Sequence, residues 1–181
     1  MRLLFELDKK DYDIHGKAFV RPSVRGIIIQ DSKIAMVHSL KYNYYKFPGG
    51  GIENNESQIE TLIREVQEEA GLVVIPETIK EYGLVHRIQK GKIEPVYIQD
   101  NFYYICQTEP TIISQHLDDY EADERFTLEF VEPQTAIEAN RKKDHGPKDP
   151  IMLEREAKVL ECLIRDGFFD NIKKNSKYGF F

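Results

Sequence analysis

The stretch GGGIENNESQIETLIREVQEEAGL, residues 49–72, constrains the fold more than any other part of the chain. Five apolar residues in it recur at the spacing of one helical face: Ile59, Leu62, Ile63, Val66 and Ala70. Glu56 and Ser57 stand where such a helix can begin, and Gly71 supplies a signal for its end. The stretch therefore predicts a glycine loop that leads into an amphipathic helix.

The far end of this helix gathers negative charge. Glu68 and Glu69 lie three and four residues after Glu65, so one flank carries three carboxylates that repel one another. A solvated face more commonly alternates Glu with Lys. Carboxylate oxygens are hard ligands suited to Mg²⁺ or Mn²⁺, and Mg²⁺ also binds substrate phosphates. The cluster therefore predicts a divalent-metal site, and neutralising one glutamate should leave the metal-free protein no less stable.

Composition limits the classes of protein that carry such a site. The 181 residues suit a single domain, and the net charge of −6 with a pI near 5.5 opposes a nucleic-acid polymer as partner. A small anionic ligand is compatible with this charge if a metal bridges the two. Cys106 and Cys162 have no CxxC spacing, and we expect both to be buried in a reducing compartment. We find no apolar run long enough for a signal peptide or a membrane span, so we expect a soluble, cytoplasmic protein without membrane partners.

The remaining sequence indicates a mixed α/β fold whose strands come first. Residues 23–30 and 33–40 flank Asp31-Ser32 and predict a hairpin. Residues 96–107 predict a long strand near the middle of a sheet, with residues 84–88 as its partner.

The second half of the chain predicts one more helix between irregular segments. Residues 151–166 carry five apolar side chains at helical spacing: Leu153, Ala157, Leu160, Leu163 and Ile164. Asp149-Pro150 provides a cap and a first-turn proline. Residues 107–125 and 139–149 are expected to be long loops, and the aromatic segment 167–181 has no clear period.

The glycine loop and acidic helix together resemble the Nudix box. The pattern is Gly, five residues, Glu, seven residues, then Arg-Glu-aliphatic-any-Glu-Glu-any-Gly-aliphatic. Its fixed positions are all present: Gly50, Glu56, Arg64, Glu65, Val66, Glu68, Glu69, Gly71 and Leu72. The resemblance implies an α/β/α sandwich with a mixed β-sheet. It predicts one domain over residues 1–181, with a core at about 20–166, an N-terminal extension at 1–19 and a C-terminal tail at 167–181.

The resemblance also implies an activity. Nudix hydrolases cleave a diphosphate linkage in a nucleoside diphosphate joined to another moiety, and they use a divalent metal. By motif position, Glu65, Glu68 and Glu69 match the metal-binding and catalytic glutamates, and Arg64 matches the residue that orients them. The Gly50 carbonyl and Glu56 complete the implied metal set in the box. Which glutamate acts as the general base stays open.

A further acidic ligand often follows the central strand in this family. Residues 128–140, LEFVEPQTAIEAN, are similar to the segment that carries it. Glu129 is the best match for this metal ligand, and Glu124 is the second choice.

The substrate is less constrained than the metal site. Markers of the ADP-ribose, dinucleoside polyphosphate, coenzyme A and NADH subgroups are not found beside the box. Tyr45 is a candidate for stacking on a base, and Arg25, Lys46 and Arg87 are candidates for binding phosphates. The expected substrate is a nucleoside triphosphate or a nucleotide sugar. Three histidines lack metal-ligand spacing and are expected to be structural or solvated: His38, His86 and His116.

Two alternatives share the fold. A noncatalytic nucleotide-sensing module more commonly has lost a metal glutamate, and an isoprenyl diphosphate isomerase usually departs from the box that is intact here. A homodimer is also compatible with the aromatic tail.

Overall fold

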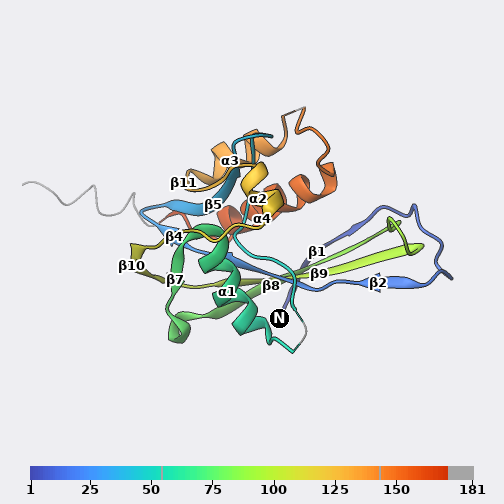
Figure 1. The fold of residues 1–181 in the computed structure, drawn as a ribbon, viewed down its shortest axis with the longest axis horizontal. Coiled ribbons are helices and arrows are strands. Elements are labelled where there is room, and N and C mark those ends of the chain that lie inside the picture. Colours follow the sequence, from blue (N-terminus) through green and yellow to red (C-terminus); the bar gives the residue numbers. More distant parts are fainter. Residues whose placement is uncertain (54, 143, 171–181) are drawn as a thin grey trace, which may run out of the picture. The chain divides into compact units, whose positions relative to one another are not determined.

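Figure 1 shows the computed structural model of the chain, which describes residues 1–53, 55–142 and 144–170. The chain forms two compact units, and each unit is built from two separate stretches. The first unit comprises Met1–Ile27 and Pro48–His116, and the second comprises Ile28–Phe47 and Leu117–Phe181. Most of the predicted aromatic tail, from residue 171 onward, lies outside the described residues.

The first unit contains most of the strands and the predicted acidic helix. Its elements are β1 (Leu3–Asp8), β2 (Ala18–Val20), β3 (Ser23–Ile27), α1 (Gln58–Ala70), β7 (Leu72–Val74), the 3-10 helix η1 (Pro76–Thr78), β8 (Lys80–Gln89), β9 (Val96–Ile105) and β10 (Thr108–Ile112).

A mixed sheet organises this unit. Its strand order is β1-β8-β9-β2, and β3 also pairs with β9. The β8 and β9 strands are antiparallel, whereas β1 runs parallel to β8, and β2 and β3 run parallel to β9. The predicted long strand and its partner at residues 84–88 are therefore confirmed, and β9 is central because strands pair with both of its edges.

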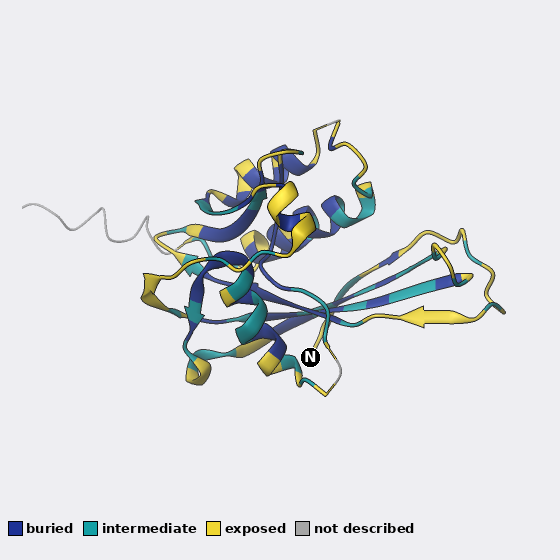
Figure 2. Cartoon of the chain, viewed as in Figure 1, coloured by how far each residue is buried: buried dark blue, intermediate teal, exposed yellow. Residues whose placement is uncertain are grey.

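The N-terminal extension adds two strands to this sheet. β1 pairs with β8 and β2 pairs with β9, and residues 9–17, which connect β1 to β2, contain no helix or strand. Figure 2 shows β2 as an exposed strand, and all three of its residues are exposed. The α1 helix packs against β3 and β7 within the same unit.

The described part of the second unit combines a small sheet with three helices. Its elements are β4 (Ile29–Gln30), β5 (Lys33–Ser39), β6 (Tyr44–Lys46), α2 (Asp119–Asp123), β11 (Phe126–Val131), α3 (Pro133–Asn140) and α4 (Pro150–Arg165). Its antiparallel sheet has the order β11-β5-β4, and β6 pairs with β5. The α3 and α4 helices pack on each other and on β6.

The predicted hairpin is only partly correct. The β4 and β5 strands pair across Asp31 and Ser32, whose φ angles of 48° and 61° suit the tight two-residue turns that right-twisted strands favour. The first predicted strand, however, is divided at Ile28 into β3 and β4. β3 belongs to the first sheet because it finds its partner in β9, more than 70 residues further along the chain.

The prediction of a long loop at residues 107–125 is wrong. This segment contains β10, which pairs with β7, and the short helix α2. The side chains of Asp118 and Glu121 form a capping box around α2, a local signal that the acidic composition obscured. The second predicted loop, residues 139–149, is partly correct: Ala139 and Asn140 belong to α3, and residues 141, 142 and 144–149 form no helix or strand.

The last helix follows its prediction closely. Asp149 caps α4 by accepting a hydrogen bond from the Ile151 amide, and Pro150 occupies the first turn. Four of the five predicted apolar residues are buried: Leu153, Ala157, Leu160 and Leu163. Ile164 is instead 38% exposed.

Both cysteines are free and buried, as predicted. None of the helices in the described part of the chain has the length and apolar character that a bilayer crossing requires.

Candidate metal and diphosphate site

Local sequence signals define the two ends of α1. The Ser57 hydroxyl accepts a hydrogen bond from the Glu60 amide, and the Glu60 carboxylate accepts one from the Ser57 amide, so a capping box begins the helix. Gly71 ends it in the left-handed conformation, with φ at 65°. Leu62, Val66 and Ala70 are buried, and this orientation leaves the flank with Arg64 and Glu68 accessible.

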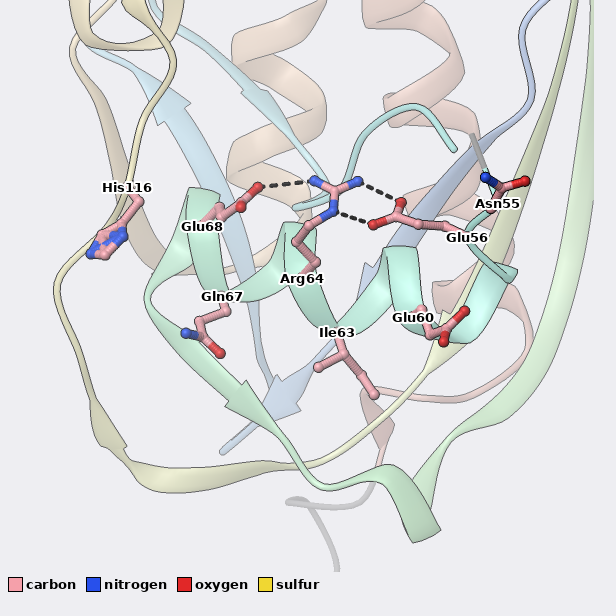
Figure 3. Close-up of a pocket in the computed structure, with 8 residues that line it drawn as sticks. All are labelled: Asn55, Glu56, Glu60, Ile63, Arg64, Gln67, Glu68 and His116. Carbon is pink, nitrogen blue, oxygen red and sulfur yellow. Dashed lines mark hydrogen bonds and ion pairs between the residues drawn. The ribbon is translucent and has the colours of Figure 1, made fainter. Parts of the chain in front are cut away.

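Arg64 lies at the centre of the acidic cluster. Its Nε and Nη2 atoms donate to the two carboxylate oxygens of Glu56, at 2.6 and 2.8 Å. Its Nη1 atom donates to both Glu65 and Glu68, at 2.9 and 3.0 Å. Figure 3 shows Arg64 between Glu56 and Glu68 on the surface of α1. The repulsion inferred from the sequence is therefore offset by a shared guanidinium, because charge-assisted and bidentate bonds are the strong ones.

This arrangement changes the pKa values of its members. Hydrogen bonds from Arg64, and to a smaller extent from Thr61, lower the pKa of Glu56 to about 2. Hydrogen bonds to Glu56, and less strongly to Glu65 and Glu68, hold the pKa of Arg64 above its usual range. Glu56 and Arg64 therefore remain charged together over the whole neutral range.

The glycine loop lies directly against the glutamates of α1. The Gly49 amide donates to Glu69 at 2.8 Å, and Glu69 is only 2% exposed. Gly49 has a φ of 140°, which glycine adopts readily and other residues do not. A Cβ atom on Gly50 would lie 2.3 Å from a carboxylate oxygen of Glu65. The loop therefore needs glycine at residue 50 so that this carboxylate can approach the backbone.

The donor set suits a hard cation without forming a complete cage. Within the described residues, no group of three or more His, Cys, Asp or Glu side chains is placed to hold a metal ion. The carboxylates of Glu65 and Glu68 nevertheless accept hydrogen bonds from the same nitrogen of Arg64. The Glu65 carboxylate also packs against Gly50, where it occupies the space that a side chain would need. Two carboxylates bonded to one nitrogen fit Mg²⁺, which usually keeps several waters and takes the rest of its ligands from substrate phosphates. The Gly50 carbonyl, another predicted ligand, accepts a hydrogen bond from the Val24 amide at 2.9 Å.

An open cavity of about 570 Å³ lies over this flank of α1. Eight of the described residues line it, and Figure 3 labels them: Asn55, Glu56, Glu60, Ile63, Arg64, Gln67, Glu68 and His116. His116 does not belong to the helix, and its backbone amide donates to the Glu68 carbonyl at 2.8 Å. Sequence reasoning missed His116, because this contact joins residues 48 positions apart and leaves no local pattern.

Two of the predicted phosphate-binding residues lie in the first unit and are buried. Arg25 donates through Nη1 to the Gly49 carbonyl and so supports the glycine loop. Arg87 donates to the Gln89 side chain at 2.7 and 3.0 Å, and its guanidinium lies 5.7 Å from the centre of the Tyr97 ring.

The other predicted residues lie in the second unit. Tyr45 donates to Glu129 at 2.9 Å, and its ring stacks on His38, which contacts the other oxygen of Glu129 at 2.6 Å. Burial, followed by the bond to Glu129, raises the pKa of Tyr45 to about 12. Lys46 is buried over the Phe126 ring.

Glu124, the second choice for the downstream ligand, is also in the second unit. It is 5% exposed, and its carboxylate accepts hydrogen bonds from Tyr44, Ser39 and Lys148. These donors account for its position without a metal, whereas the side chain of Glu129 is 37% exposed.

The fold, the box and the Arg64 cluster together define a Nudix protein. The sequence profile of the NUDIX domain matches residues 20–154, so the chain belongs to the Nudix hydrolase family, as the sequence predicted.

Individual proteins that match this chain have low sequence identity to it. An RNA pyrophosphohydrolase from Stenotrophomonas maltophilia (strain K279a) is 31% identical over 88 residues, which are 48% of this chain and 41% of that protein. The chain therefore spans about two fifths of the length of this relative.

Two solved structures share the fold. A mutator MutT protein from Bacillus halodurans has a TM-score of 0.52 and 20% identity, covering 66% of this chain and 72% of its own. The E. coli ORF135 protein has a TM-score of 0.53 and 21% identity, covering 82% of this chain and 93% of its own. These likenesses confirm the α/β Nudix fold with a mixed sheet.

Proposed function

We propose that this chain is a divalent-metal-dependent hydrolase that cleaves a diphosphate linkage in a nucleotide. The observation that carries the proposal is the convergence of Glu56, Glu65 and Glu68 on Arg64, beside the glycine loop. A cluster of carboxylates repels a polyanionic substrate, so it can bind one only when bound cations neutralise the charge between the protein and the substrate.

Each member of the cluster has a proposed task. Glu65 and Glu68, with the Gly50 carbonyl, are the residues that would hold Mg²⁺ or Mn²⁺. Arg64 fixes their carboxylates, and Glu56 fixes Arg64 by its two-oxygen contact. Glu69 orients the glycine loop through the Gly49 amide and contributes negative charge behind the metal ligands. The predicted downstream ligand, Glu129, stays a prediction.

The reaction is a displacement at phosphorus. A water molecule attacks one phosphorus of the diphosphate, the bond to the bridging oxygen breaks, and one proton passes from the water to a carboxylate of α1. A bound divalent cation would supply charge neutralisation and lower the pKa of a bound water. Arg64 and the glycine loop keep the acidic side chains in place before substrate arrives, so little reorganisation is needed during the reaction.

The proposed substrate is a nucleoside triphosphate or a nucleotide sugar. The 31% identical relative is named an RNA pyrophosphohydrolase, and this name adds a second candidate, an RNA that carries a pyrophosphate. The net charge of −6 weighs against a polymer, because its many phosphates require excess Lys and Arg on the protein. A cytoplasmic location agrees with two buried, free cysteines and likewise stays a prediction.

A substrate screen tests the proposal. Purified protein is incubated with nucleoside triphosphates, nucleotide sugars, dinucleoside polyphosphates and a 5′-triphosphorylated RNA, each with Mg²⁺ or with excess EDTA. We expect products cut within a diphosphate, identified by mass spectrometry, only with Mg²⁺. Glu68→Gln should lower the rate by orders of magnitude while keeping the helix, since Gln is also a good helix former.

The alternatives give different results in the same screen. Tight binding of a nucleotide without turnover would indicate a sensing module. Full activity in excess EDTA would overturn the metal-dependent mechanism.

A further inference from the structure

His116 lies on a loop that is fastened to the end of α1. The Ile113 amide donates to the Gly71 carbonyl at 2.9 Å, and the His116 amide donates to the Glu68 carbonyl at 2.8 Å. The Gln115 side chain donates to the Glu69 carbonyl. The last carbonyls of a helix lack intrahelical partners, and this loop supplies donors to two of them. The backbone of His116 is thereby held beside the peptide of a proposed metal ligand.

The cavity over α1 offers a phosphate few hydrogen-bond donors, because its charged side chains are mostly carboxylates. Three of its lining residues are acidic, namely Glu56, Glu60 and Glu68. Among the described lining residues, Arg64 is the one permanent cation, and each of its three guanidinium nitrogens already donates to a glutamate. Asn55 and Gln67 add only neutral amide donors. A diphosphate bound here needs donors that these carboxylates do not already occupy.

The His116 side chain meets this requirement. It is exposed, lines the same cavity as Glu68, and forms no side-chain hydrogen bond with the described residues. An imidazole always carries at least one N–H donor.

We propose that His116 contacts the substrate and donates a hydrogen bond from its imidazole to a nonbridging oxygen of the diphosphate. This assignment rests on the proposed function, since it presumes that the diphosphate lies against α1. It replaces the expectation that His116 is merely solvated.

The kinetic test compares two substitutions at His116 with a matched control. His116→Ala should lower kcat/KM by roughly 10- to 100-fold, the effect of losing a hydrogen bond to a charged group. The change should lie mainly in KM, and His116→Gln, which keeps an N–H donor, should recover part of it. His15→Ala is the control, because His15 is also exposed and also uses its backbone amide in a local hydrogen bond. All three variants should melt within about 2 °C of the wild type, since exposed substitutions change stability little.

A spectroscopic test needs no turnover. Inorganic pyrophosphate with Mg²⁺ should shift the imidazole NMR signal that disappears in His116→Ala and should leave the signal of His15 unchanged. The shift should be absent in Glu68→Gln, whose metal ligand is removed.

The two tests separate this inference from the proposed function. A wild-type enzyme that hydrolyses nucleotides and depends on Glu68, combined with a kcat/KM of His116→Ala within twofold of the wild type, would refute the role of His116 alone. An unshifted imidazole signal would refute the diphosphate contact, whether or not the enzyme turns over.

Discussion

Arg64 and Glu56 form the tightest ion pair of the site, and this pair makes stability depend on pH. The pKa of Glu56 falls from an ordinary 4.5 to about 2 because Arg64 donates to it. A lowered folded-state pKa adds stability that is present above the unfolded value and is lost as the pH falls toward the folded value. The contribution of Glu56 should therefore fade between about pH 4.5 and pH 2.

Urea unfolding of the metal-free protein measures this contribution. The midpoint of the wild type should exceed that of Glu56→Gln at pH 7, and the difference should shrink at pH 3. Glu77→Gln, an exposed position outside the cluster, controls for the general loss of a carboxylate. A difference that stays constant from pH 7 to pH 3 would contradict the Arg64 pairing.

Gly50 and Gly51 are neighbours with different surroundings. A Cβ atom on Gly50 would strike the Glu65 carboxylate at 2.3 Å, whereas one on Gly51 would lie 3.0 Å from the flexible end of Arg21. Gly50→Ala should therefore displace Glu65 and reduce the Mg²⁺-induced rise in melting temperature, while Gly51→Ala should retain it. Thermal melts with and without Mg²⁺ check both variants. If Mg²⁺ raises the melting temperatures of both variants equally, metal binding does not depend on the contact between Glu65 and Gly50.

The three glutamates of α1 differ in environment, although the sequence made them equivalent. Glu68 has a 41% exposed side chain and an i,i+4 pair with Arg64, and such pairs stabilise a helix by only about 0.5 kcal/mol or less. Glu69 is buried and accepts the Gly49 amide. In metal-free protein, Glu68→Gln should change stability little. For Glu69 the expectation from the sequence is revised: Glu69→Gln should cost about 1–3 kcal/mol, because it places amide donors in a buried position.

Mg²⁺ should separate a metal site from a merely acidic helix. A ligand that binds only the folded state at ten times its Kd adds about 1.4 kcal/mol of stability. Mg²⁺ should therefore raise the melting temperature of the wild type more than that of Glu68→Gln. NaCl at matched ionic strength should raise neither selectively, since it acts only by screening. Identical shifts in both proteins and both salts would exclude a specific site.

The path of the chain predicts cooperative unfolding. Neither compact unit is a continuous segment, because the chain passes between them after Ile27, Phe47 and His116. We therefore expect one two-state transition, with coincident tyrosine fluorescence and circular dichroism melts and equal calorimetric and van't Hoff enthalpies. Two separate transitions would contradict the prediction of a single domain over residues 1–181. Light scattering of the same samples tests whether the chain forms a homodimer.

Local sequence determined the parts of this protein whose interactions are local. The capping box at Ser57, the stop at Gly71 and the apolar spacing between them suffice to predict α1, since each joins residues within a few positions. The same holds for Asp149 and α4. Helical spacing also brought Arg64 and Glu68 together, because residues four apart are neighbours on a helix. Glu56 reaches Arg64 from outside the helix, since it precedes the Ser57 cap.

Tertiary structure decided what depends on segments far apart in the chain. It divided residues 23–30 between two sheets, because β3 found an edge of β9 that no local signal marks. It buried Glu69 against the glycine loop, although Glu68 beside it stays accessible. It also carried His116 to the end of α1 through hydrogen bonds to helix carbonyls, which any residue with an amide could make. Backbone hydrogen bonds of this kind do not depend on side-chain identity, so the sequence carries no signal for them. Only the folded chain shows which side chain they place at the site.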